Sequence, residues 1–200
     1  MKKELREFKE FKKNFKFKQL ELIEKDDCVY CKDYLVKDSE GNTINETDEF
    51  INVGYKLKGP LSKALSNLFP YSFVFKGKRV ESIEAVFQGI KFPNKKEQNY
   101  VLAYKGLDAN NVKITSNYDW KESGNLYWQG KAINRFSNEY KDFVEELYVS
   151  AIQNPLYRNL LKNTKKYIMH SIGVTDEKLT VFTRYEFEEM LNCLVAFLNK

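Results

Sequence analysis

Apolar positions in the first fifteen residues recur at intervals of three and four, which is the spacing of one face of a helix. Leu5, Phe8, Phe11 and Phe15 share that face, and lysines and glutamates fill the other. We expect a helix that docks on the rest of the chain through its phenylalanines and keeps its lysines in solvent. The pattern leaves open a nucleic-acid-binding arm and a helix that binds a partner.

Residues 19–58 change to patterns typical of strands and turns. Residues 19–24 largely alternate between apolar and polar, residues 29–36 are rich in strand-forming side chains, and residues 50–57 allow a further strand. Lys58-Gly59-Pro60 then interrupts the pattern. We therefore predict that residues 1–58 form an appendage, a basic amphipathic helix followed by strands.

The remaining chain, residues 59–200, is expected to form the main domain. Residues 72–80 predict a hairpin that turns at Lys76-Gly77-Lys78. Predicted helices begin at Ser82, near Phe136, at Pro155 and at Thr183, whose Thr-x-x-Glu sequence is a capping box. The pattern as a whole predicts an α+β fold that is predominantly helical after residue 80.

Composition and charge limit the class of protein. Hydrophobic residues make up 42% of the 200 residues, enough for a packed core, and no apolar run is long enough to cross a membrane. The first residues lack the apolar stretch of a secretion signal, so we expect a cytoplasmic protein with no membrane contact. Residues 1–20 hold eight basic and three acidic side chains, which accounts for the whole net charge of +5. Only this N-terminal arm offers even a weak contact for nucleic acid.

The chain contains few metal-binding or redox side chains. Its three cysteines are an odd, low number that argues against a disulfide framework. Cys28 and Cys31 form one Cys-x-x-Cys, but a structural zinc site needs four ligands. The single histidine, His170, lies far away in sequence, and we expect it to be structural rather than catalytic. Because glycine-rich nucleotide-binding motifs are also missing, we expect neither a metal nor a cofactor.

The predicted helix at Ser82 carries a polar stripe next to its apolar face. Glu84, Gln88 and Lys91 follow one another at helical spacing, and Glu84 falls in the first turn, where the helix dipole favours an ionised carboxylate. Most stripes of this kind are solvated faces, so the stripe alone does not indicate a site.

The sequence before this helix supplies a second motif. A Leu-Ser-Asn-x-x-Pro segment and a short hairpin lead into Ser-x-Glu-x-x-Phe-Gln-x-x-Lys-Phe. The residues concerned are Leu65, Ser66, Asn67, Pro70, Gly77, Ser82, Glu84, Phe87, Gln88, Lys91 and Phe92. In this order they resemble the NADAR/YbiA-like family, and the likeness continues more loosely through Asp119-Trp120 and Gln153-Asn154-Pro155. It implies a YbiA-like fold for residues 59–200. The Trp-Gly-x-Gly segment common near that family's C-terminus is absent here.

The resemblance implies an enzyme that acts at the anomeric carbon of a ribose. Breaking a ribosyl C–N bond builds a cation that a carboxylate can stabilise while an acid protonates the leaving nitrogen. Glu84 is the candidate carboxylate and Asp119 a second one; Lys91 is a candidate proton donor, amine nucleophile or phosphate contact. The candidate substrate-binding residues are Ser66, Asn67, Phe69, Gln88 and Trp120, the aromatic ones for stacking a base.

Three functions remain open at this point. The first is an N-glycosidase that removes ADP-ribose from a modified base such as guanine in nucleic acid. The second is an N-glycosidase that cleaves a phosphoribosylamine intermediate of the riboflavin pathway. The third is a non-catalytic module that binds NAD or ADP-ribose. A closed pocket would favour a small substrate, and an open groove beside the basic arm would favour nucleic acid.

Overall fold

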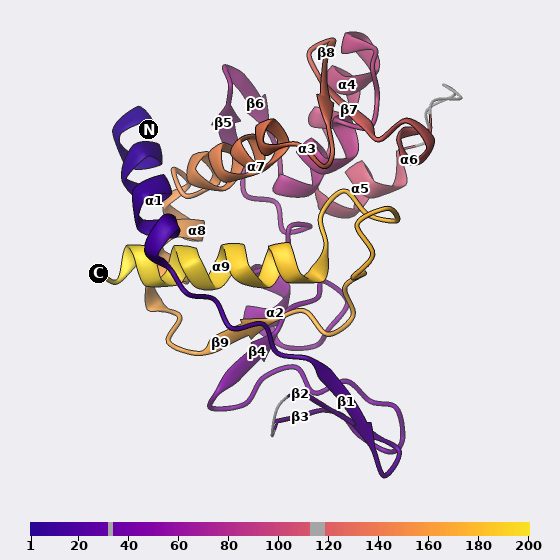
Figure 1. The fold of residues 1–200 in the computed structure, drawn as a ribbon, viewed down its shortest axis with the longest axis vertical. Helices are drawn as coiled ribbons and strands as arrows, with labels where there is room; N and C mark the ends of the chain where they lie inside the picture. Colours follow the sequence, from indigo (N-terminus) through magenta and orange to yellow (C-terminus); the bar gives the residue numbers. More distant parts are fainter. Residues whose placement is uncertain (32–33, 113–118) are drawn as a thin grey trace.

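The computed structural model describes residues 1–31, 34–112 and 119–200 (Figure 1). The helices are α1 (Lys2–Asn14), α2 (Pro60–Ala64), α3 (Ile83–Gly89), α4 (Lys95–Leu102), α5 (Gly106–Asn111), α6 (Trp120–Ser123), α7 (Asn138–Ala151), α8 (Pro155–Asn163) and α9 (Arg184–Leu198). The strands are β1 (Leu22–Lys25), β2 (Cys28–Cys31), β3 (Tyr34–Lys37), β4 (Phe50–Asn52), β5 (Phe73–Phe75), β6 (Lys78–Val80), β7 (Asn125–Trp128), β8 (Lys131–Asn134) and β9 (Tyr167–Met169). The mixed α+β class predicted from the sequence is confirmed.

The strands form several small sheets rather than one large one. Strands β1, β2 and β3 make an antiparallel sheet, and β5–β6 and β7–β8 are hairpins. The β5–β6 hairpin was predicted, and Lys76 and Gly77 both have the positive φ, 46° and 77°, that a tight two-residue turn requires. The β7–β8 hairpin was not predicted.

Strands β4 and β9 pair in parallel, although a large part of the chain separates them. Ile51 lies opposite Ile168, and both side chains are fully buried. The pairing brings the residues that follow each strand, Val53 and His170, side by side. The Nδ1 atom of His170 lies 2.7 Å from the carbonyl oxygen of Val53. The pairing therefore joins the predicted appendage to the C-terminal part of the chain.

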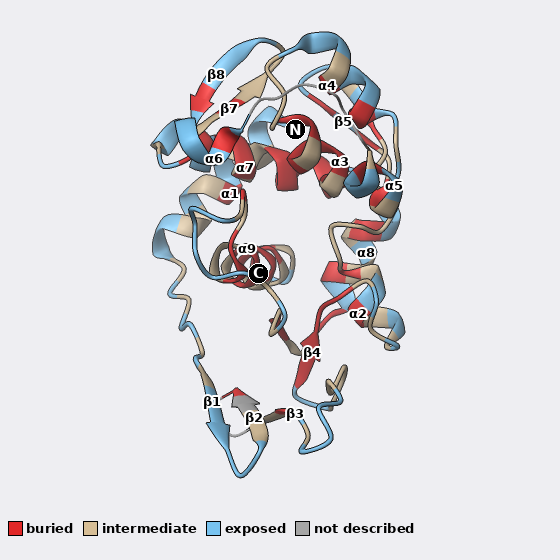
Figure 2. Ribbon diagram, turned by 90° about the vertical axis from the view of Figure 1, so that its right-hand side faces the viewer, coloured by how far each residue is buried: buried red, intermediate tan, exposed pale blue. Residues whose placement is uncertain are grey.

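The main core lies between α3, α7, α8 and α9 (Figure 2). The predicted inward-facing residues of α3 and its C-terminal end, Ile83, Phe87 and Ile90, are at most 3% exposed. Ser82 caps α3, since its Oγ accepts a hydrogen bond from the backbone N–H of Ala85 at 3.1 Å. Helix α3 is thus held against the core on one side while its polar stripe faces away.

Helix α1 packs on α7 and α9 as its phenylalanine spacing predicted. Phe8 is fully buried, and its ring meets that of Phe197 edge to face at 5.5 Å. The lysines of α1 are not all in solvent, however. Lys9 forms an ion pair with Asp142, and Lys12 forms one with Glu145 at 3.0 Å. Both carboxylates belong to α7, so two of the N-terminal charges take part in docking the helix.

No helix in the described part of the chain is long and apolar enough to cross a membrane.

Cys28 and Cys31 occupy the two ends of β2, and both are free thiols.

Candidate functional site

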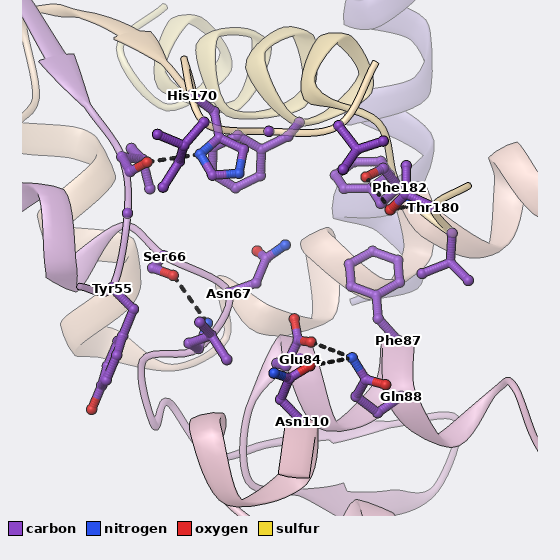
Figure 3. Close-up of a pocket in the computed structure, with 18 of the residues that line it drawn as sticks. Tyr55, Ser66, Asn67, Glu84, Phe87, Gln88, Asn110, His170, Thr180 and Phe182 are labelled. Carbon is purple, nitrogen blue, oxygen red and sulfur yellow. Dashed lines mark hydrogen bonds between the residues drawn. The ribbon is translucent and has the colours of Figure 1, made fainter. Parts of the chain in front are cut away.

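A cavity of about 700 Å³ lies beside the polar stripe of α3 (Figure 3). Its walls come from α3, from α5, from the loop after β4, from the loop before β5 and from the loop that joins β9 to α9. Cavities of several hundred Å³ are the usual size for small-molecule ligands. We call this cavity the α3 pocket.

The start of α3 is fixed to the loop that precedes β5. The backbone N–H of Glu84 donates to the carbonyl oxygen of Asn67 at 3.0 Å. Ser82 Oγ also accepts from the N–H of Gly106 at 3.1 Å, which ties α5 to the same helix end. Gly106 has a φ of +41° and packs so closely on the backbone of Leu68 that a Cβ would lie 1.9 Å from its carbonyl oxygen. Three segments therefore meet around Glu84.

Gln88 connects the polar groups on this wall. Its amide nitrogen donates to Glu84 Oε1 at 2.6 Å and to Asn110 Oδ1 at 2.8 Å. Its amide oxygen accepts from Lys91 Nζ at 2.7 Å. An ammonium group only donates, so this contact fixes which end of the Gln88 amide faces Lys91. The predicted stripe is thus a continuous hydrogen-bonded chain of ammonium, amide and carboxylate.

Burial shifts the pKa of both charged members of the chain toward the neutral form. Loss of solvation raises the pKa of Glu84, and the hydrogen bond from Gln88 and the charge of Lys91 oppose that shift only in part. Loss of solvation likewise lowers the pKa of Lys91, against the attraction of Glu84. Glu84 keeps some accessible surface because it lines the cavity. Its charge is therefore poorly compensated where a ligand would meet it.

Asn67 presents a hydrogen-bond donor on the adjoining wall. Its Oδ1 accepts a hydrogen bond of 2.7 Å from the hydroxyl of Tyr148. Tyr148 is fully buried, and burial raises its pKa well above the ordinary value, so the phenol stays protonated and donates. The amide nitrogen of Asn67 has no hydrogen-bond partner among the described residues, and Figure 3 shows this side chain beside Glu84.

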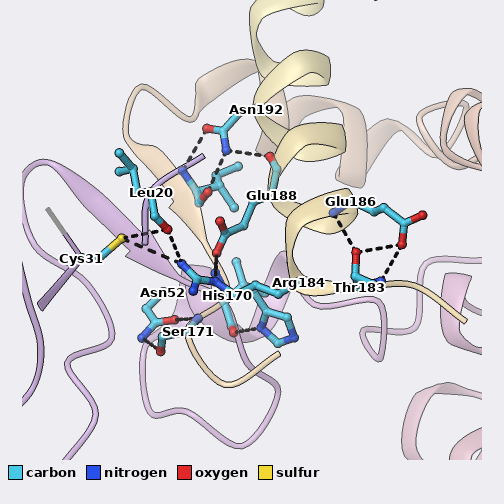
Figure 4. Close-up of polar contacts among 12 residues, drawn as sticks. Leu20, Cys31, Asn52, His170, Ser171, Thr183, Arg184, Glu186, Glu188 and Asn192 are labelled. Atoms are coloured by element: carbon cyan, nitrogen blue, oxygen red, sulfur yellow. Dashed lines mark hydrogen bonds and ion pairs between the residues drawn. The ribbon is translucent and has the colours of Figure 1, made fainter. Parts of the chain in front are cut away.

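His170 forms the opposite wall of the α3 pocket (Figure 3). The carbonyl oxygen of Val53 can only accept, so Nδ1 of His170 carries the hydrogen and Nε2 of the neutral ring is an acceptor. Burial lowers the pKa of His170, which keeps the ring neutral. Its backbone N–H donates to Glu188 Oε1 at 2.7 Å, and Glu188 pairs with Arg184 at 2.7 Å (Figure 4). A buried ion pair therefore supports this wall from behind.

The loop before α9 brings an aromatic ring to the pocket. Phe182 stacks on Phe87 with ring centres 5.0 Å apart and planes 20° from parallel. Arg135 holds this loop through two hydrogen bonds to Glu186, at 3.0 and 2.6 Å, and a third, at 3.4 Å, to the carbonyl oxygen of Thr180. The buried hydroxyl of Tyr140 also donates to a backbone carbonyl of this loop. Phe182 is thus held in place by contacts outside the cavity.

The predicted site residues divide into two groups. Those that line the α3 pocket are Ser66, Asn67, Glu84, Gln88 and Lys91. The others lie elsewhere: Asp119 is an exposed cap of α6, Trp120 is a core residue at 6% exposure, and Phe69 packs on Tyr71 at 4.7 Å. None of these three lines the pocket. The stripe and its preceding loop form one site, whereas the later aromatic and acidic candidates do not join it.

Several residues that line the pocket were not among the predicted site residues. His170 was expected to be structural, and the β4–β9 pairing that brings it to the cavity is not visible in any local pattern. Phe182 precedes the capping box at Thr183, so its place at a helix start was predictable. Its stacking on Phe87 was not predictable from the sequence. Asn110 gave no signal in the sequence.

The comparisons with known proteins identify the family. The family model described as bacteriophage protein GP30.3 matches residues 59–195. The uncharacterized 17.1 kDa protein in the Gp30-rIII intergenic region of Enterobacteria phage T4 is 34% identical over 137 residues, which are 66% of this chain and 89% of that protein. No solved structure matches the chain. The chain belongs to the bacteriophage protein GP30.3 family.

This result corrects the resemblance drawn from the sequence. The match to the GP30.3 family and to the T4 protein takes the place of the NADAR/YbiA-like assignment, for which the comparisons give no evidence. The motif from Leu65 to Phe92 lies inside the matched residues, so its spacing belongs to a GP30.3 protein. A helix with a buried apolar face and a polar stripe is a common solution to local packing, which explains why such spacing misled. Hypotheses about chemistry must therefore rest on the pocket itself.

Proposed function

We propose that the protein hydrolyses the N-glycosidic bond of a ribosyl nucleotide in the α3 pocket. The observation that carries the proposal is Glu84: a carboxylate on a cavity wall, held by a neutral amide, with its charge only partly compensated. A buried carboxylate of this kind favours a ligand that develops positive charge beside it. Cleavage of a ribosyl C–N bond develops that charge at the anomeric carbon.

The reaction needs a base, an acid and water. Glu84 acts as the general base and takes a proton from water while the water oxygen bonds to the anomeric carbon. The electron pair of the broken C–N bond stays on the nitrogen of the leaving nucleobase. The leaving nitrogen takes a proton, which Lys91 supplies. Burial lowers the pKa of Lys91, so its ammonium gives up a proton more readily than an exposed lysine does. The products are a free ribose hydroxyl and a protonated leaving nitrogen, and water is the other reactant.

The remaining walls suit the rest of a nucleotide. The donor nitrogen of Asn67 and the acceptor nitrogen of His170 match ribose hydroxyls, which both donate and accept. The half-buried ring of Phe182 offers a surface for a base, and Lys56 at the pocket lining offers a charge for phosphate. Gln88 acts through Glu84 and Lys91 as a positioning residue. A cavity of about 700 Å³ accommodates a ligand the size of ADP-ribose.

The basic N-terminal arm does not flank this pocket. None of its residues lines the cavity, and α1 packs on α7 and α9 instead. By the criterion of substrate size, this arrangement favours a small ribosyl nucleotide over a base within nucleic acid. We propose the ADP-ribosyl linkage to guanine as the first bond to assay, and a comparison of ADP-ribosylated guanosine with an ADP-ribosylated oligonucleotide tests the expected preference for a small substrate.

The test compares wild-type protein with Glu84→Gln, and uses Glu139→Gln as a control. Glu139 is an exposed carboxylate whose one ion pair within the described ranges is with Lys131. We expect the Glu84→Gln change to lower kcat roughly 100- to 10,000-fold, the usual range for loss of a general base, and the control to leave kcat unchanged. Because Glu84 must be ionised to act, wild-type kcat/KM should fall at acid pH, and the raised pKa places that fall above the ordinary glutamate range. Equal turnover by the wild-type and Glu84→Gln proteins would contradict the proposal.

A binding measurement separates catalysis from recognition. Calorimetry that detects ADP-ribose binding to the α3 pocket, without turnover of any ribosyl nucleotide, would favour a non-catalytic binding module instead. If the protein binds neither ADP-ribose nor the intact nucleotide, both the proposed N-glycosidase and the non-catalytic binding module are contradicted.

A further inference from the structure

A second hollow lies under the segment that joins α1 to β1. This segment, residues 15–20, is called the strap here. The hollow has a volume of about 400 Å³ and shares no lining residue with the α3 pocket. The residues that line it are Phe15, Lys16, Phe17, Lys18, Leu20, Tyr167 and Asn192. It thus combines the strap with the start of β9 and the middle of α9, and none of the described residues that line it is acidic.

Two of the N-terminal lysines without an ion pair lie on the strap. Lys9 and Lys12 pair with acids of α7, whereas Lys16 and Lys18 are exposed and form no ion pair within the described residues. Two lysines without an ion pair that line one hollow favour a polyanionic ligand.

Aromatic rings lie between these charges. Phe17 and Tyr167 are nearly parallel, with planes 5° apart and ring centres at 6.2 Å. Phe17 is only half-buried, as is Phe15 next to it. Lysines alternating with partly accessible rings are the arrangement that holds single-stranded nucleic acid, since phosphates meet the charges while unpaired bases stack on the rings. A volume of about 400 Å³ is larger than one nucleobase needs.

We propose that the strap hollow binds single-stranded nucleic acid, with one base against Phe17 and the flanking phosphates at Lys16 and Lys18. A duplex fits the observations less well, because its bases stay stacked and cannot enter a hollow. This site is independent of the chemistry proposed for the α3 pocket, and neither requires the other.

The test measures binding of a fluorescent deoxythymidine oligonucleotide by anisotropy at several salt concentrations. The variant Lys16→Gln/Lys18→Gln removes two phosphate contacts, and Lys25→Gln/Lys96→Gln removes the same charge from exposed sites outside the hollow. Each phosphate contact to a single strand contributes about 0.7 to the slope of log K against log salt. We expect the strap variant to lower that slope by about 1.4, while the control variant leaves it unchanged.

A second variant tests stacking separately from charge. Phe17→Leu keeps an apolar cover over Tyr167 but removes the ring. It should weaken binding about tenfold and abolish the fluorescence quenching of a 2-aminopurine base in the oligonucleotide. Three results would each overturn the proposal: no binding at low salt, an equal change of slope in the strap and control variants, or heparin binding as tight as that of the oligonucleotide with unaltered 2-aminopurine fluorescence.

Discussion

Two carboxylates of this protein, one fully buried and one on a cavity wall, have different surroundings. Glu188 on α9 is fully buried, and it accepts hydrogen bonds from the Arg184 guanidinium and from the backbone N–H of His170, each at 2.7 Å. Glu84 on α3 has a neutral amide as its direct partner, and its nearest cation is held by the far end of that amide. Burial raises the pKa of both groups.

The difference separates a carboxylate that supports the fold from one that is available to a ligand. The charge of Glu188 is paired with a guanidinium in the same interior through Oε1, although its Oε2 atom has no hydrogen-bond partner among the described residues. The charge of Glu84 faces a cavity and remains partly uncompensated. Groups whose pKa is shifted by burial beside a cavity are candidates for a functional role, which is the basis of the proposal for Glu84.

The largest change in stability is expected when Glu188 loses its partner Arg184. Arg184→Met should lower the free energy of unfolding by about 3–5 kcal/mol, because it leaves a carboxylate buried without its cation. Replacing both residues, as Arg184→Met/Glu188→Met, should restore most of that loss. Urea unfolding measures both changes. A loss below about 1 kcal/mol in the single variant would mean that the ion pair does not support the pocket wall.

A smaller effect is expected at the ion pair that holds the loop of Phe182. The side chain of Arg135 is 3% exposed and that of Glu186 is 30% exposed. Arg135→Met should cost about 1.5–3 kcal/mol, the range for hydrogen bonds to charged groups, and should weaken ligand binding in the α3 pocket by loosening the loop. Arg79→Met, at an ion pair whose arginine side chain is 75% exposed, should change stability by less than about 1 kcal/mol. Similar losses in both variants, again by urea unfolding, would contradict the assigned role.

The smallest expected change in stability is a gain rather than a loss, and it comes from a substitution at Glu84. Glu84→Gln should stabilise the fold at neutral pH, by about 1 kcal/mol at most, because it removes a poorly compensated charge while keeping an acceptor for Gln88. A carboxyl whose pKa is raised on folding holds its proton more tightly in the folded state, so its contribution to stability is lost as pH rises from the ordinary value of 4.5 through the raised pKa. The advantage of the variant should therefore grow across that window in thermal unfolding at a series of pH values. A variant less stable than wild type at every pH would show that Glu84 serves the fold, as Glu188 does.

The sequence predicted the local elements of this fold well and the long-range pairings poorly. The phenylalanine spacing of α1, the cap at Ser82 and the capping box at Thr183 each depend on neighbours within a few residues, and all three are confirmed. The β7–β8 hairpin was missed, although Gln129 and Gly130 adopt the positive φ of a tight turn. The parallel pairing of β4 with β9 depends on residues far apart in the chain, and no local pattern of apolar and polar residues predicts it.

The same distinction explains which site residues were found. Glu84, Gln88 and Lys91 lie within two turns, so helical spacing alone places them in one row. His170 reaches the cavity through the pairing of β9 with β4, and Phe182 lies in a loop that Arg135 and Tyr140 anchor. Trp120 was expected beside Glu84, but a large apolar ring has more to gain from the core, where it lies.

The hydrogen bond between His170 and Val53 closes a loop of 117 residues. Contacts that span so much chain are slow to form, because the entropy of closing the loop must be lost before the contact stabilises anything. During synthesis the ribosome must therefore release the segment that contains His170 before either wall of the α3 pocket meets the other. Until then β4 has an unpaired edge, and a nascent chain stalled before residue 167 would present Phe50 and Ile51 to any other strand it meets.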